Sequence, residues 1–220
     1  MNYTIDYPLF MWLNFDGGEC LDRAMILISG VWLWVPFYLL MLYLVWRKDG
    51  WRGMLLFVVV AAAAMGLSDM ICGIFKHSGP LADAWSDFPP RWRPMFTPAL
   101  EDLTISPDSL RAWRFNPTAE LPHAVHVPDG VVGGSRYGTV SAHAATIVAV
   151  ATLSASVIRK RWYSLLAFLV ALLVCYSRIY LAKHFPIDIA LGAVVGATIA
   201  YGLYLLYGLL IKAVGGRVNK

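Results

Sequence analysis

Ionisable side chains gather beside the ends of the apolar segments of this sequence, where they could do chemistry. His143 stands at the start of one apolar segment, and His184 and Asp188 stand at the start of another. Charged and titratable residues at membrane depth are costly, so they are functional candidates by default. A histidine can serve as a nucleophile or as a proton donor. The two histidines therefore predict a site of acid–base or covalent chemistry.

Basic residues dominate the same regions of the sequence. Four of them are expected near the two histidines: Lys76, Arg93, Arg178 and Lys183. Arginine presents a planar fork of donors that matches phosphate oxygens, and helix N-termini also attract anions through their unpaired N–H groups. Because two of the apolar segments begin here, the pocket is expected to bind a multiply charged anion.

A metal centre is the competing interpretation of this cluster. Asp69, Asp188 and the two histidines are ligands of the usual kinds. The crowded lysines and arginines would repel a cation, however, so we expect no metal and no other cofactor. His123 and His126 have a spacing found in metal sites, but two ligands do not make a site.

The composition predicts that the elements around this cluster lie in a membrane. Of the 220 residues, 59% are hydrophobic and only 15% are charged, whereas soluble domains carry about 25% charged residues. A helix needs about 20 apolar residues to cross a bilayer. Five segments meet this need: Met25–Trp46, Met54–Phe75, Val140–Ile158, Ser164–Ala182 and Ile187–Ile211. The expected fold is all-α, a polytopic membrane helical bundle with five transmembrane helices.

Shorter features complete the expected bundle. The apolar stretch Tyr3–Phe15 is too short to cross a membrane, and it is expected to form an N-terminal interfacial helix. The run Ala61–Ala64 and three glycines of the last span, Gly192, Gly196 and Gly202, are expected at close helix contacts.

Three cysteines indicate no disulfide framework, and a net charge of +4 is too small to indicate a nucleic-acid partner.

The basic loops predict the orientation of the bundle. Lysine and arginine cluster in three places: residues 47–52, 159–161 and 212–220. Short loops rich in these residues stay in the cytoplasm, and the three clusters alternate as five spans require. The two histidines are then expected on the non-cytoplasmic side.

A long segment at about residues 76–138 is expected to lie outside the membrane. It holds nine of the 12 prolines of the chain. Trp85, Trp92 and Trp113 argue against disorder, because aromatic residues are scarce in disordered chains. Ser106 before a proline predicts a short helix that reaches Trp113. The whole chain, residues 1–220, is interpreted as one membrane-embedded domain that carries this loop.

Three stretches resemble the signatures of the type 2 phosphatidic acid phosphatase superfamily. Ser177–Asp188 reads Ser-Arg, five residues, His, three residues, Asp, and it resembles the third signature. Val140–His143 is similar to the second, Pro-Ser-Gly-His, with Val and Ala replacing Pro and Gly. Lys76 with Arg93-Pro94 is similar to the first, a Lys followed by Arg-Pro. An insertion separates its two parts, which makes Arg91 an alternative to Arg93.

The resemblance implies a role for each matching residue. His184 would be the nucleophile, Asp188 would orient its ring, and His143 would protonate the leaving group and then activate water. Four residues would bind the phosphate oxygens: Lys76, Arg93, Ser141 and Arg178. Asp69 could position Lys76 or serve another basic residue.

The resemblance also implies a function. The expected enzyme is a hydrolase of a bacterial cytoplasmic (inner) membrane that acts without metal, through a phosphohistidine, on a lipid phosphate at the periplasmic or exterior face. Candidate substrates are undecaprenyl diphosphate, lipid A phosphates, phosphatidylglycerophosphate and phosphatidate. The alternatives are a lipid phosphotransferase with the same site and a non-enzymatic lipid phosphate transporter. The sequence makes no prediction of the oligomeric state.

Overall fold

The computed structural model describes residues 6–96, 125–131 and 136–215, and the regular elements in these ranges are helices joined by turns and irregular segments. The elements are α1 (Tyr7–Leu13), α2 (Gly18–Ser29), η1 (Trp32–Trp34), α3 (Val35–Ile74), η2 (Pro94–Phe96), α6 (Ala142–Ile158), α7 (Arg161–Tyr180) and α8 (Pro186–Gly215). The described residues contain no strand, and their one isolated β-bridge joins Trp92 to Tyr137. The prediction of an all-α fold is confirmed.

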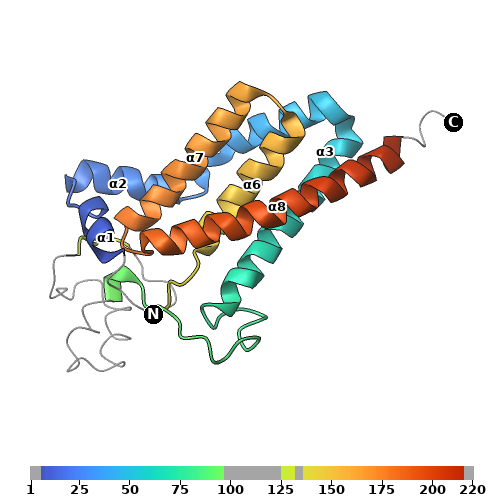
Figure 1. Cartoon of the computed structure of the whole chain (residues 1–220). Coiled ribbons are helices and arrows are strands. Elements are labelled where there is room, and N and C mark those ends of the chain that lie inside the picture. Colours follow the sequence, from blue (N-terminus) through green and yellow to red (C-terminus); the bar gives the residue numbers. More distant parts are fainter. Residues whose placement is uncertain (1–5, 97–124, 132–135, 216–220) are drawn as a thin grey trace.

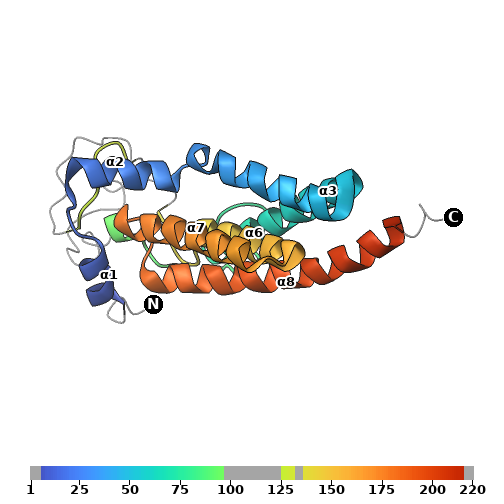
Figure 2. The same cartoon turned by 90° about the horizontal axis from the view of Figure 1, so that it is seen from above.

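The long helices form an elongated bundle (Figure 1). Viewed from above, α2 and the N-terminal half of α3 lie along one side, α8 lies along the other, and α6 and α7 lie between them (Figure 2). The α6 sequence is rich in alanine, and α6 packs against α3, α7 and α8. The helix that begins at the second predicted signature is therefore the centre of the bundle.

Helix α3 consists of two arms that meet at Gly50. This residue has φ 71° and ψ −177°, a conformation that glycine adopts without steric cost. The arms, residues 35–49 and 51–74, match most of the first two predicted spans. Three helical stretches among the described residues are long and apolar enough to cross a membrane: Trp32–Ile74, Arg161–Tyr180 and Pro186–Ala213. Because the first of these contains both arms and α6 is shorter, five crossings stay a prediction.

The first predicted span, Met25–Trp46, is not a continuous helix. Helix α2 ends at Ser29, and Gly30 is extended with φ −83° and ψ 162°. A short 3₁₀ turn follows, and α3 begins with a proline in its first turn. The indole N–H of Trp34 donates to the Ile28 carbonyl at 2.8 Å across the break. The apolar composition predicted one helix here, but the glycine and the proline divide it.

Helix α1 covers only part of the interfacial helix predicted at Tyr3–Phe15. Its Phe10 is fully buried and packs against Phe185, with ring centroids 5.0 Å apart. Trp12 on the same helix is 75% exposed. The structure thus attaches one face of α1 to the start of α8, and the interfacial position of the other face stays a prediction. The short helix predicted at Ser106 lies outside the described residues.

Two glycines allow α8 to approach α6 closely. A Cβ added at Gly192 would lie 2.3 Å from the Ser141 carbonyl oxygen, and one at Gly196 would lie 2.0 Å from the Ala145 carbonyl oxygen. The prediction of close packing is confirmed at these two positions. It is wrong at Gly202, where an added Cβ meets nothing within 4 Å.

We predict that Gly196→Ala lowers the free energy of unfolding by about 1–3 kcal/mol, because the added methyl group overpacks the contact with the α6 backbone. Thermal unfolding of the purified protein in detergent measures this effect. Gly202→Ala is the matched control, and it is expected to leave stability unchanged or slightly higher. Equal effects of the two substitutions would contradict the close α6–α8 contact.

Candidate active site

The helix ends that carry the three predicted signatures meet at one end of the bundle. The second arm of α3 ends there, α6 and α8 begin there, and α7 ends there (Figure 1). Between α7 and α8 the chain turns through Ala182, which has φ 52°. The amide N–H groups of Lys183 and His184 both donate to the Arg178 carbonyl, at 3.0 and 3.3 Å. This turn fixes the third signature as a compact unit.

Of the two candidate catalytic histidines, His184 is the more enclosed. It is 2% exposed, and its Nδ1 lies 2.8 Å from the carbonyl oxygen of Gly138. Because a carbonyl oxygen can only accept, Nδ1 carries the hydrogen and Nε2 keeps its lone pair. Burial lowers the pKa of His184 well below its usual value, and the charges of Arg93 and Arg178 lower that pKa further. The ring is therefore neutral at neutral pH, as a nucleophile must be.

Asp188 does not hold the His184 ring as predicted. Its Oδ2 accepts a hydrogen bond from the Phe185 amide at 3.0 Å, and its backbone carbonyl accepts from the Ser141 amide at 2.9 Å. The carboxylate thus caps the start of α8 and the backbone joins α8 to the start of α6. The Gly138 carbonyl orients the ring instead. Sequence reasoning missed Gly138 because a backbone acceptor leaves no signal in residue type.

Ser141 and His143 lie at the beginning of α6 in different environments. Ser141 is fully buried, and its Oγ accepts from the Ala144 amide at 3.3 Å as the helix N-cap. His143 is exposed and lines a cavity of about 370 Å³ together with Asp69 and apolar residues of α3, α6 and α7. The structure therefore places a histidine where a bound molecule can reach it. The predicted phosphate contact of Ser141 stays a proposal.

The two candidate arginines of the first signature occupy different positions. Arg91 is 2% exposed, forms a two-pronged ion pair with the buried carboxylate of Asp6, and stands 3.8 Å above the Phe185 ring. Its Nη1 also lies 3.8 Å from Asp188 Oδ1. Asp6 in turn accepts from the Ile187 amide at 3.0 Å. Arg91 therefore anchors the start of α8 to the N-terminal segment.

Arg93 lies beside the turn that carries His184. Its Nη1 donates to the Lys183 carbonyl at 3.4 Å, and its charge is the first of those that lower the pKa of His184. The amide of Arg93 donates to Arg136 O at 3.1 Å, and the amide of Gly138 donates to Arg91 O at 2.8 Å. This short pairing holds Arg93 beside the residue that orients His184. The structure thus places Arg93 beside the turn that carries His184 and Arg91 in the anchor of α8, and the phosphate contact of either arginine stays a proposal.

Lys76 and Arg178 complete the basic group around His184. Lys76 is 8% exposed, and burial lowers its pKa; the charge of Arg93 adds to this lowering, while Asp69 acts in the opposite direction. Arg178 is 6% exposed and donates through Nη1 to the hydroxyl of Ser29. Both cations also lower the pKa of His184. The site thus holds several partly desolvated positive charges around a neutral imidazole.

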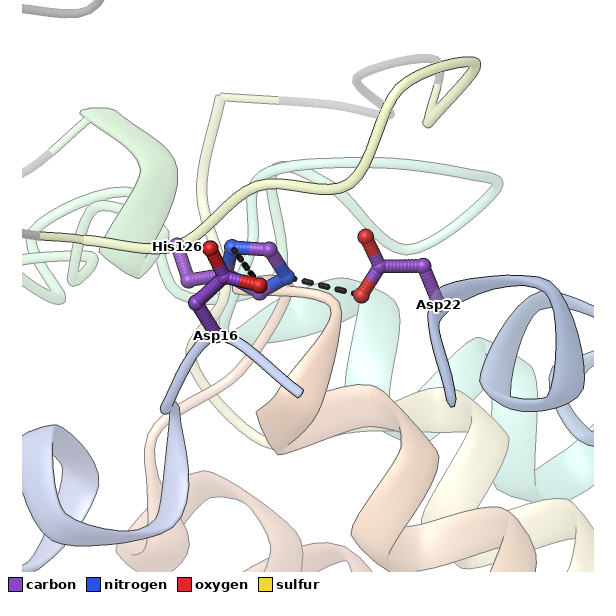
Figure 3. A group of neighbouring side chains, drawn as sticks. All are labelled: Asp16, Asp22 and His126. Atoms are coloured by element: carbon purple, nitrogen blue, oxygen red, sulfur yellow. Dashed lines mark hydrogen bonds and ion pairs between the residues drawn. The ribbon is translucent and has the colours of Figure 1, made fainter. Parts of the chain in front are cut away.

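A separate group of carboxylates surrounds His126. Its Nε2 lies 2.8 Å from Asp22 Oδ1 and its Nδ1 lies 4.0 Å from Asp16 Oδ1 (Figure 3). The hydroxyl of Tyr180 also donates to Asp22 Oδ1, at 2.6 Å. Asn14 accepts from the His126 amide and donates to the Tyr180 carbonyl. These contacts tie the N-terminal segment to the end of α7. His123, the second histidine of the predicted spacing, lies outside the described residues.

Comparison with known proteins agrees with this geometry. Residues 57–212 match the PAP2 superfamily, and the chain belongs to that family. It is 30% identical over 203 residues to a lipid A 4'-phosphatase of Bacteroides thetaiotaomicron, across 92% of this chain and 76% of the relative. It is 27% identical over 209 residues to a lipid A 4'-phosphatase of Porphyromonas gingivalis, across 94% and 75%. No solved structure matches. The protein is a phosphatase.

We predict opposite outcomes for the two arginines. Arg91→Met leaves the buried Asp6 and Asp188 carboxylates without their cation, and it should lower the free energy of unfolding by about 3–5 kcal/mol. Arg93→Met should change stability little but lower kcat/KM about 100-fold or more, through loss of a charge that acts in the transition state. Thermal unfolding and phosphatase assays of both variants measure this. Severe destabilisation by Arg93→Met with full activity in Arg91→Met would reverse the assignment.

Proposed function

We propose that this phosphatase hydrolyses the phosphate of an amphiphilic lipid through a phosphohistidine on His184. The observation that carries the proposal is the neutral imidazole of His184, oriented by Gly138 O and surrounded by cations. A neutral ring with a lone pair on Nε2 can attack phosphorus, and the cations can stabilise the charge on the equatorial oxygens. A site built only to hold a lipid phosphate has no need for an oriented, neutral histidine.

The proposed reaction uses the two histidines in turn. His184 Nε2 forms a bond to phosphorus while the bond from phosphorus to the lipid oxygen breaks. In this scheme the negative charge of the bound phosphate keeps His143 protonated, and His143 donates that proton to the lipid oxygen as the dephosphorylated lipid leaves. His143 then takes a proton from water, the water oxygen bonds to phosphorus, and the bond to His184 breaks to release inorganic phosphate. Arg93, Arg178 and Lys76 bind the phosphate oxygens throughout, with the Ser141 hydroxyl as a further ligand.

Asp188 acts in this scheme as a positioning residue. Its carboxylate holds the start of α8, and Arg91 holds that carboxylate. The role replaces the direct contact with the His184 ring that the sequence predicted. Asp188 affects the reaction indirectly, because it fixes the position of the loop between α7 and α8, which carries His184.

The relatives support a lipid A phosphate as the first substrate to test, because both are named for a phosphatase acting on lipid A. Undecaprenyl diphosphate, phosphatidylglycerophosphate and phosphatidate are the alternatives. Apolar residues line most of the cavity that contains His143, which suits a substrate with a hydrocarbon part. Release of free phosphate distinguishes hydrolysis from transfer to a second lipid.

We predict that the purified protein releases phosphate from at least one of these lipids in excess chelator. The reason is that the basic residues, rather than a metal ion, supply the positive charge. His184→Ala should lower the rate by about a thousandfold or more, with unchanged thermal unfolding, and Lys160→Met is the control at an exposed lysine. Activity lost in EDTA and restored by zinc or magnesium would refute the metal-free mechanism. Retention of most of the rate in His184→Ala would refute the nucleophile.

We further propose that the site faces the non-cytoplasmic side of a bacterial inner membrane. In a Cys20→Ser background, Ser86→Cys should react with an impermeant thiol reagent applied to spheroplasts, and Lys160→Cys should react only after lysis. Ser86 and Lys160 are both exposed, while the remaining cysteines are buried. The basic loops set this expectation. The reverse labelling pattern would place the site in the cytoplasm.

A further inference from the structure

A second cavity lies beside the proposed phosphate site. Its volume is about 290 Å³, and the end of α2, the segment at Gly130 and the turn between α7 and α8 form its walls. Three residues supply its polar side chains: Ser29, Arg178 and Lys183. We call this cavity the basic chamber. Ile26, Leu181 and Val131 also line it.

Two cations share the basic chamber. Burial lowers the pKa of Lys183 to about 8, and the charges of Arg178 and Arg93 add to that lowering. Arg178 is only 6% exposed, yet its Nε has no hydrogen-bond partner among the described residues. Buried donors are normally paired, and each exception requires an explanation. An anion in the chamber would offset the repulsion between the two cations.

The chamber is distinct from the place of reaction. Neither His143 nor His184 lines it, whereas His143 lines the larger cavity. Lys183 is not among the cations that lower the pKa of His184, which are Arg93, Arg178 and Lys76, although its charge also acts on His143. Ser29 and Gly30 line both cavities, so the end of α2 separates them. Arg178 is the residue common to the chamber and to the phosphate site.

We propose that the basic chamber is a second anion subsite, in which Lys183 binds a phosphate or carboxylate that the same substrate carries at a distance from its reacting phosphate. The substrate class is then an amphiphile with at least two anionic groups. This inference rests on the proposed function. It makes Lys183 a specificity-determining residue, and it leaves the three other cations to the phosphate that reacts.

The subsite is tested with two synthetic glycolipids that have identical acyl chains and carry either one phosphate or two. The wild-type enzyme should show kcat/KM about tenfold or more higher for the doubly phosphorylated glycolipid, because a charge-assisted contact is formed only with that substrate. Lys183→Met should bring this ratio close to one. Lys183→Arg should keep most of the preference, and Lys160→Met should keep all of it.

The outcomes separate this proposal from the proposed function. If Lys183→Met and Lys183→Gln lower kcat/KM equally for both glycolipids while Lys183→Arg does not, Lys183 belongs to the grip on the reacting phosphate and the subsite is refuted. An unchanged ratio in both variants also refutes the subsite. If the wild-type enzyme hydrolyses no lipid phosphate at all, the proposed function itself fails. Lys183→Gln retains a polar side chain, and a thermal unfolding curve for each variant confirms that folded proteins are compared.

Discussion

The hydrogen bond between the Gly138 carbonyl and Nδ1 of His184 is the constraint on which the rest of the site depends. It joins residues 46 positions apart and selects the tautomer of a fully enclosed ring. Without it, the proton could rest on either nitrogen and the buried ring could turn. With it, Nε2 is the nitrogen left to attack. The surrounding helices and loops bring this carbonyl and this ring together.

Two supports hold the carbonyl and the ring in place. The segment that contains Gly138 pairs with the segment that contains Arg93, and a Cβ at Gly138 would lie 3.2 Å from Arg93 Cγ. On the other side, Asp188 caps α8, and Arg91 joins that cap to Asp6. A Cβ at position 138 would therefore fit only if the Arg93 side chain shifted by a few tenths of an ångström.

Strained backbone accompanies these supports. Val140 has φ 54° and Ala182 has φ 52°, in the left-handed region that costs a residue with a Cβ roughly 1–2 kcal/mol. Each lies within two residues of a candidate site residue, Ser141 and His184. Proline, the usual residue of the second signature at position 140, cannot adopt a positive φ. The backbone at position 140 therefore excludes proline, and the β-branched valine occupies it at a steric cost.

The sequence predicted well what side-chain type and apolar pattern determine. The helical fold, the gathering of the signatures at one end of the bundle and the packing at Gly192 and Gly196 all follow from such patterns. It failed where a backbone group or a distant ion pair decides the outcome. Asp188 was expected at the His184 ring, but no residue pattern reveals a carbonyl at Gly138. The pairing of Asp6 with Arg91 joins residues 85 positions apart, and spacing carries no information on such a contact.

The most direct test of the account is the chemical identity of the phosphorylated residue. A lipid phosphate mixed with the enzyme and quenched in alkali within milliseconds, with His143→Ala used to slow hydrolysis of the intermediate, allows mass spectrometry and ³¹P NMR of the trapped phosphoenzyme. The account predicts a single phosphohistidine, on His184 and at Nε2, because Nδ1 donates its hydrogen to Gly138 O. Phosphate on Nδ1 of His184, on His143 or on any other residue would contradict it.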